Sequence, residues 1–185
     1  MLRLKELINY DTNNGPGMRL SIWFSGCTNH CPGCWAKDTW DYYHGVPLRD
    51  KIPDINALMD VNDGVSLLGG DPLCCVFNHP EDVGELVRLL EDIKARDKSI
   101  WVWTGYTVNE LYTIPTSIFN QIFGNIDYLV VGRFIQEKRD LTLKWRGSSN
   151  QRIVRPSPVT KDKAFRNHIF LDVTDKCDNG ELDWE

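Results

Sequence analysis

The chain has 185 residues, of which 42% are hydrophobic and 25% charged, and its formal net charge is −5. This length and composition predict one globular domain with its own core, and the acidic balance argues against general nucleic-acid binding. The N-terminal sequence predicts no signal peptide. No apolar run reaches about 18 residues, so we expect no membrane span and a cytoplasmic location.

The first predicted elements lead into a group of cysteines. The Asn-Asn-Gly-Pro-Gly sequence at residues 13–17 predicts a turn. Residues 19–24 place apolar side chains at alternate positions and predict a strand. Cys27, Cys31 and Cys34 follow this strand directly, at spacing C-x3-C-x2-C.

This cysteine segment is suited to an iron–sulfur cluster. Pro32 lacks an N–H group, and Gly26 and Gly33 add backbone freedom, so we expect a loop and not a helix. Thiolates are the soft ligands that hold such clusters, and each iron of a cubane takes one of them. Three cysteines therefore leave one iron without a protein ligand, and that iron is open to chemistry.

Two other interpretations of the cysteine spacing stay open. A zinc site could recruit His30 as a fourth ligand, although structural zinc usually uses two ligand pairs separated by a longer spacer. A disulfide would leave one cysteine over. Clustered cysteines in a chain without secretion signals are more typical of metal ligands in a reducing compartment.

The rest of the chain alternates between predicted helices and strands. Periodicity and capping signals predict helices at residues 35–43, 53–60, 80–97, 107–113 and 115–124, where the third has the clearest apolar face and the fourth opens with a capping box at Thr107. Apolar runs predict further strands at residues 65–68, 99–103, 126–131 and 169–173.

This alternation predicts an α/β fold, specifically a partial, open β/α barrel with mostly parallel strands. A full eightfold barrel typically needs about 250 residues. The cysteine loop, Gly69-Gly70-Asp71-Pro72, Thr104-Gly105 and Gly132-Arg133 each follow a predicted strand. The carboxyl ends of parallel strands meet at one edge, so we expect these four segments to lie together. We expect Asp71 to accept hydrogen bonds from a ligand ammonium group there.

The remaining cysteines and charges have less specific interpretations. Cys74 and Cys75 are predicted to pack in the core, and Cys177 to be a spare thiol in a polar tail. Residues 137–155 carry six basic side chains and Trp145, so this segment is either a solvated loop or a docking surface, and Arg146 is either part of that surface or a buried structural residue. The acidic tail from residue 172 onward is predicted to be partly disordered.

The cysteine loop followed by a Gly-Gly-acidic-Pro turn resembles the radical S-adenosylmethionine (SAM) superfamily. Further motifs occur in the order typical of its glycyl-radical enzyme activases, in the branch that serves anaerobic ribonucleoside-triphosphate reductases. These motifs are Asn14-Gly15-Pro16-Gly17, Thr39-Trp40, residues 101–106 (WVWTGY) and residues 145–151 (WRGSSNQ). The chain departs from many superfamily members in having Gly33 where they have an aromatic residue and Asp71 where they have Glu.

The resemblance implies a [4Fe–4S] cluster on Cys27, Cys31 and Cys34, with SAM chelated to the open iron. The reduced cluster would cleave SAM to a 5′-deoxyadenosyl radical, which takes a hydrogen atom from a backbone glycine of the reductase. By family analogy the electron donor is flavodoxin-like. The implied SAM-contacting positions are Gly33, Cys34, Trp35, Gly70, Asp71, Thr104 and Gly105.

The resemblance covers roughly residues 7–155, which predicts a radical SAM activase domain at 1–155 and a C-terminal extension at 156–185. Two alternative functions stay open. One is a radical SAM enzyme that acts on a small nucleotide-like substrate, and the other is a non-catalytic iron–sulfur or zinc module.

Overall fold

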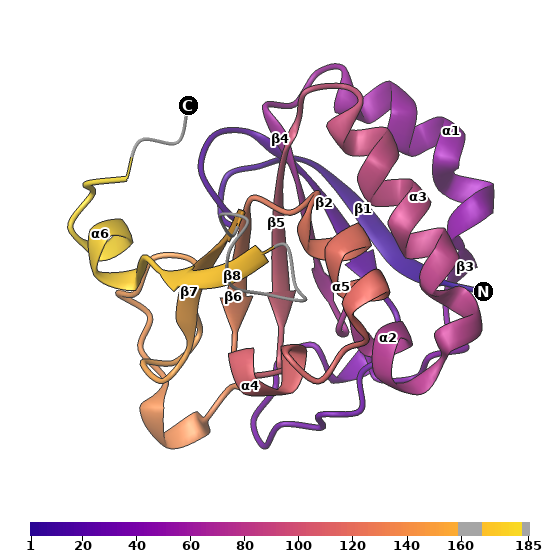
Figure 1. Cartoon of the computed structure of the whole chain (residues 1–185). Coiled ribbons are helices and arrows are strands. Elements are labelled where there is room, and N and C mark those ends of the chain that lie inside the picture. The colour runs from indigo at the N-terminus through magenta and orange to yellow at the C-terminus, as the bar shows by residue number, and fades with distance from the viewer. Residues whose placement is uncertain (159–167, 183–185) are drawn as a thin grey trace.

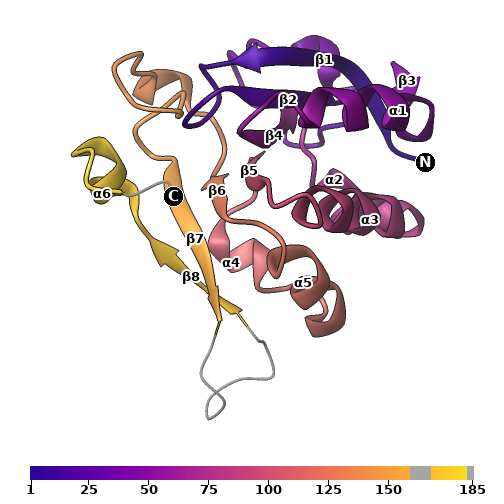
Figure 2. The same ribbon diagram turned by 90° about the horizontal axis from the view of Figure 1, so that it is seen from above.

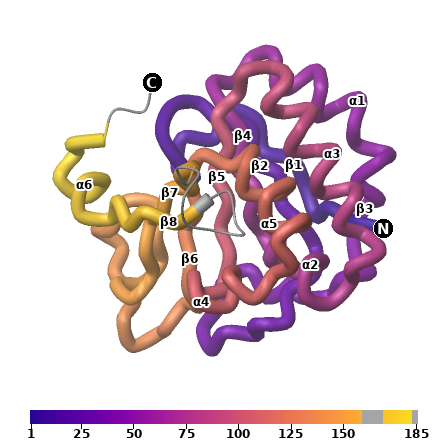
Figure 3. Tube along the Cα trace, viewed as in Figure 1, coloured from indigo at the N-terminus to yellow at the C-terminus, as the bar shows by residue number. Residues whose placement is uncertain are grey.

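A computed structural model of the chain describes residues 1–158 and 168–182. Eight strands form a single open sheet in the order β3-β1-β2-β4-β5-β6-β7-β8 (Figure 1). The two-residue strand β3 and the helix α6 lie at opposite ends of the molecule (Figure 3). The strands are β1 (Arg3–Asp11), β2 (Arg19–Phe24), β3 (Val46–Pro47), β4 (Gly64–Gly69), β5 (Ser99–Thr104), β6 (Tyr128–Val131), β7 (Arg152–Pro158) and β8 (His168–Asp172).

Most of the helices cover one face of this sheet, as the view from above shows (Figure 2). Within the described ranges, no helix has the length and apolar character needed to cross a bilayer. The α-helices are α1 (Leu48–Met59), α2 (Cys74–Asn78), α3 (Val83–Lys94), α4 (Val108–Leu111), α5 (Thr116–Phe123) and α6 (Thr174–Asp178), and the 3-10 turns are η1 (Lys37–Thr39), η2 (Pro80–Asp82) and η3 (Gln136–Lys138).

The two faces of the sheet carry different side chains because successive residues of a strand point to opposite sides. On the helix-bearing face, Ile22 packs in the main core with Leu86 and Leu90 of α3, and all three are fully buried. Burial of each such side chain stabilises the fold by about 1.5–3 kcal/mol. The other face is rich in aromatic residues, with Trp23 and Trp101 in two smaller clusters.

The sequence correctly predicted the central strands, but it was wrong that the strands are mostly parallel. The pairs β2–β4, β4–β5 and β5–β6 are parallel, whereas the four pairs outside them are antiparallel. The turn at residues 13–17 joins β1 to β2 as a hairpin. The strands β7 and β8 close the other end of the sheet in the same antiparallel manner.

Two helix predictions need correction. Residues 35–43 form only the turn η1, because the carbonyls of Thr39 and Trp40 accept bonds from Gly26 N (2.7 Å) and Cys27 N (3.1 Å) instead of closing helical turns. Helix α1 begins at Leu48, so Pro53 lies inside it and not at its start. The predicted capping box at Thr107 is confirmed at the start of α4.

The acidic tail is also more ordered than the sequence predicted, since α6 occupies residues 174–178. Cys177 is not a spare thiol on a polar tail. It is fully buried in the aromatic face beside Trp101 and Tyr128. The last three tail residues lie outside the described ranges.

Candidate functional site

The four segments predicted to converge do follow strands β2, β4, β5 and β6. These strands are parallel neighbours, so their carboxyl ends share one edge of the sheet. The glycine-rich turn after β4 is tied to the start of the cysteine loop. Gly70 N donates to Phe24 O (2.8 Å), and Asp71 N donates to Gly26 O (2.7 Å). The predicted convergence is therefore confirmed at the level of the backbone.

Gly70 is required by this close approach. A Cβ at Gly70 would lie 2.5 Å from Gly26 O and 2.9 Å from Thr39 O, and both are backbone atoms. The turn and the cysteine loop therefore pack backbone against backbone.

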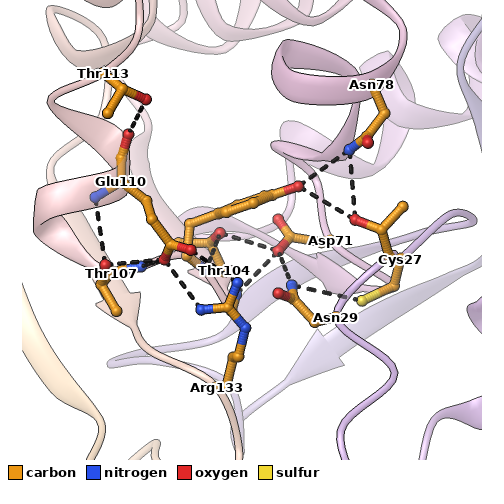
Figure 4. Close-up of polar contacts among 12 residues, drawn as sticks. Cys27, Asn29, Asp71, Asn78, Thr104, Thr107, Glu110, Thr113 and Arg133 are labelled. Carbon is orange, nitrogen blue, oxygen red and sulfur yellow. Dashed lines mark hydrogen bonds and ion pairs between the residues drawn. The ribbon is translucent and has the colours of Figure 1, made fainter.

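Asp71 joins three strand-end segments through its side chain (Figure 4). Its Oδ2 accepts hydrogen bonds from Asn29 Nδ2 (3.0 Å), Thr104 Oγ1 (3.0 Å) and Gly105 N (2.9 Å). Its Oδ1 accepts from Leu73 N at 3.0 Å. Asp71 is only 2% exposed, so its carboxyl group binds protein groups in this structure.

Burial dominates the ionisation of the groups around Asp71. It raises the pKa of Asp71 to about 6, and the four hydrogen bonds partly oppose this shift because they favour the carboxylate. Burial also raises the pKa of the Cys27 thiol to about 11, and the charge of Asp71 adds to that shift. A thiol in such a place becomes a thiolate when a metal cation binds it.

The three predicted cluster cysteines are free and partly buried, and two of them receive N–H groups. Asn29 Nδ2 lies 3.8 Å from Cys27 Sγ. Burial raises the pKa of Cys31. A hydrogen bond from the Phe134 backbone amide and the nearby charge of Arg133 both lower this pKa, so they partly oppose the effect of burial. In the described part of the chain, no three His, Cys, Asp or Glu side chains converge on one metal ion. A cubane would take one thiolate on each of three of its irons, so its three cysteine ligands would not need to meet at a single metal ion.

These residues fit an iron–sulfur cluster. The donor set is three thiols, which are soft ligands, and N–H groups already face two of the sulfurs, as is typical around such clusters. The indole Nε1 of Trp23 is buried without a hydrogen-bond partner among the described residues, and Trp23 shares an apolar cluster with Cys34.

A second loop, residues 132–138, packs against the cysteine loop from the end of β6. It carries Arg133 and Phe134 beside Cys31, and a Cβ at Gly33 would collide with the side chain of Gln136. Gly33 also has a positive φ of 74°, which favours glycine there. The cysteine loop is therefore enclosed by two other strand-end segments.

The WRGSSNQ run at residues 145–151 holds this second loop in place. Gln151 Nε2 donates to Gly132 O (3.1 Å), and Asn150 Nδ2 donates to Arg133 O (2.8 Å). Ser148 Oγ accepts from Ile135 N at 3.2 Å. The run thus acts on the site through the backbone of residues 132–135.

The structure corrects one part of the docking surface predicted for residues 137–155. Trp145 and Arg146 are not exposed, whereas the basic residues Lys138, Arg139 and Lys144 are exposed, so docking by this segment stays a prediction. The Arg146 side chain is 2% exposed and forms an ion pair with Asp178 (2.5 Å). Trp145 is partly buried beside Trp101, and its carbonyl accepts a hydrogen bond from Trp103 Nε1 (2.8 Å). These two residues therefore hold the aromatic face together and do not form an exposed patch.

The other predicted residues have mixed positions. Trp35 is 79% exposed at the rim and contacts Trp23 edge-on, with ring centroids 5.0 Å apart. Thr104 is buried beneath the edge. Cys74 and Cys75 are buried in the main core, which confirms the packing interpretation.

Sequence reasoning missed Asn29 and the charge pair of Arg133 with Glu110. Asn29 lies inside the cysteine loop, so its position alone could have marked it. Arg133 was predicted to lie at this edge, but its partner Glu110 is 23 residues away and was not. A third missed group is a hydrogen-bonded set of Thr28, Asn78 and Tyr106, in which Asn78 Nδ2 donates to the Tyr106 hydroxyl (3.2 Å). Asn78 belongs to α2, a helix too short for periodicity to reveal.

Comparison with known proteins identifies the family of this fold and site. A family model described as a 4Fe-4S single cluster domain matches residues 13–154. The anaerobic ribonucleoside-triphosphate reductase-activating protein of Salmonella typhi is 40% identical over 158 residues, which cover 81% of this chain and 96% of the relative. The protein of the same name from Escherichia coli K12 is 42% identical, covering 76% and 90%, and that of Enterobacteria phage T4 is 32% identical, covering 77% and 87%. The chain therefore belongs to the single-cluster 4Fe-4S family that includes the anaerobic ribonucleoside-triphosphate reductase-activating proteins.

Proposed function

We propose that this protein is a radical SAM activase of an anaerobic ribonucleoside-triphosphate reductase. It cleaves SAM reductively and generates a glycyl radical on the reductase by removing a hydrogen atom from a backbone glycine. The observation that carries this proposal is the meeting of three free thiols with the Gly-Gly-Asp-Pro turn and the Thr104-Gly105 turn at one sheet edge. Relatives that carry the name of this activity cover most of the chain.

Cys27, Cys31 and Cys34 are the proposed ligands of the cluster, which when bound supplies the electron for SAM cleavage. We place SAM over the exposed parts of the edge, against Gly33, Cys34, Trp35 and the backbone of Gly70 and Gly105. Asp71 and Thr104 are almost fully buried, so their proposed role is to hold these backbones in position.

The open sheet is well suited to a protein substrate. A partial β/α barrel of the superfamily type, which we propose here, leaves a lateral opening through which a glycine-bearing loop can enter. A cavity of about 450 Å³ does exist beside β1 and α1, but its lining includes no residue of the cysteine loop or the two turns. A small nucleotide-like substrate therefore has no support from this cavity.

The remaining assignments also belong to the proposal. The electron donor is flavodoxin-like, and the protein works in the cytoplasm. We divide the chain into an activase domain at 1–155 and an extension at 156–185, and β7 continues across that division.

The test uses the full chain, reconstituted with iron and sulfide without oxygen, then reduced and mixed with SAM and an anaerobic ribonucleoside-triphosphate reductase. A glycyl signal in electron paramagnetic resonance (EPR) is the expected result. Replacement of Cys27, Cys31 or Cys34 by Ala should abolish both the cubane spectrum and SAM cleavage. Cys74→Ala is the matched control and should keep the cluster. Bound zinc without a reducible cluster would contradict the proposal.

A further inference from the structure

Arg133 places a positive charge at the edge that holds the cysteine loop. It follows β6 directly, and its charge acts on the Cys31 thiol. The neighbouring Phe134 amide is hydrogen-bonded to the same sulfur. Cys27, by contrast, is influenced by the negative charge of Asp71. Arg133 is thus the cation that acts on Cys31, where it opposes the effects of burial and of the neighbouring Cys34.

The position of this cation is fixed by Glu110 (Figure 4). Arg133 Nη2 donates to Glu110 Oε1 at 2.8 Å, and Nη1 donates to Oε2 at 3.1 Å. Glu110 Oε2 also accepts from Thr107 N (2.7 Å) and Thr107 Oγ1 (2.9 Å) as part of the capping box of α4. On the backbone side, Asn150 holds the Arg133 carbonyl. A bidentate pair anchored at both ends keeps the guanidinium in one place.

We propose that the Glu110–Arg133 pair sets the reduction potential of the cluster, with Arg133 as a positioning residue that acts through Cys31. This inference rests on the proposed ligand set. Reduction adds one electron from an external reductant and makes the cluster more negative. A nearby positive charge stabilises the reduced form and raises the potential, while Glu110 limits this effect. The reduction potential of the cluster is thus set by two opposing charges, since Arg133 raises it and Glu110 limits that rise.

The test is an EPR-monitored redox titration of the reconstituted full chain with dithionite. Arg133→Gln should move the midpoint potential to more negative values, while Arg133→Lys, which retains the charge, should stay closer to the unmodified protein. The Arg133 side chain is 44% exposed, so the shift should shrink as salt concentration rises.

Arg96→Gln is the matched control. Like Arg133, Arg96 is a partly exposed arginine paired with one carboxylate. Its Nη1 lies 2.9 Å from Asp60 Oδ1, and its side chain is 36% exposed. It follows α3 and precedes β5, so it lies at the opposite edge of the sheet from the cysteine loop. Its loss should leave the potential unchanged, although the net charge changes by the same amount.

Equal potentials in Arg133→Gln and the unmodified protein at low salt would overturn the inference, as would an equal shift in Arg96→Gln. If Arg133→Gln assembles no cluster, Glu110→Gln decides the matter, because loss of the opposing anion must raise the potential. An unchanged or lower potential in that variant would reject the inference. Failure of the unmodified protein to bind a cubane would instead reject the proposed function, so the two failures are distinguishable.

Discussion

Gly70→Ala tests whether the glycine-rich turn acts on the cluster through the cysteine loop. The added Cβ would lie 2.5 Å from Gly26 O and 2.9 Å from Gly26 C. These are backbone atoms next to Cys27, so no side-chain rotation can relieve the collision. The loop itself must move. From the sequence alone, the larger change Gly70→Val is expected to leave the cluster intact and to weaken SAM binding strongly. From the backbone contacts we predict instead that the cysteine loop moves and that less iron is bound.

The magnitude follows from the contacts that the shift would break. Overpacking in a tight site costs about 1–3 kcal/mol. Loss of the hydrogen bonds Gly70 N to Phe24 O and Asp71 N to Gly26 O adds about 1 kcal/mol each. We therefore expect unfolding in urea to require about 3–5 kcal/mol less free energy, together with a clear fall in iron bound per chain after reconstitution.

Gly84→Ala is the control for adding a methyl group at a glycine. Gly84 lies in α3, and its Cβ would meet only Arg88 Nη1 at an ordinary 3.6 Å. This variant should bind iron normally and be as stable as the unmodified protein or more stable by up to about 1 kcal/mol. If Gly70→Ala matched it in both measurements, the backbone-packing argument would be refuted.

Three further outcomes are expected. The pKa of Glu110 is lowered from 4.5 to about 2, first by its hydrogen bond with Arg133, so its stabilising contribution is present above pH 4.5 and is lost as the pH falls towards 2. The pair is exposed, so this contribution is at most about 1 kcal/mol, and acid unfolding curves of Glu110→Gln should lack it. Asp178→Ala leaves the buried Arg146 without its carboxylate and should lower the unfolding free energy by about 2 kcal/mol, whereas the exposed Asp175→Ala should not. Trp103→Phe removes the hydrogen bond to Trp145 O (2.8 Å) and should cost about 1 kcal/mol in the same urea assay while leaving iron binding unchanged.

The central strands were predictable because their signals are local. Residues 19–24 and 99–104 form apolar runs that end at glycine or threonine turns, and the structure places strands at those bounds. Strand β1 was missed because its burial pattern is irregular, and its pairing with β2 contains two register shifts. Its place in the sheet depends on the hairpin partner more than on its own periodicity.

The buried polar residues were unpredictable for a related reason. Arg146 lies in a basic segment, and the carboxylate that balances its buried charge belongs to Asp178, 32 residues later. Cys177 stands between charged residues, yet α6 turns it into the aromatic face beside Trp101. In both cases the residue that makes burial favourable is distant in sequence. The neighbouring residues in the sequence are mostly polar, so the sequence alone favoured an exposed position.

The sequence predicted the position of Asp71 at the site edge, but not the protein groups that its carboxylate binds. The sequence placed this carboxylate at the site edge as an acceptor for a ligand ammonium group. Donors from the cysteine loop, the glycine-rich turn and the end of β5 already bind this buried carboxylate, three of them at Oδ2 and one at Oδ1. Its negative charge can still favour a cation nearby, but its direct contacts fix the spacing of three strand-end loops. In the proposed function, recognition at this edge is the role of the exposed backbone and rim groups that Asp71 holds in register.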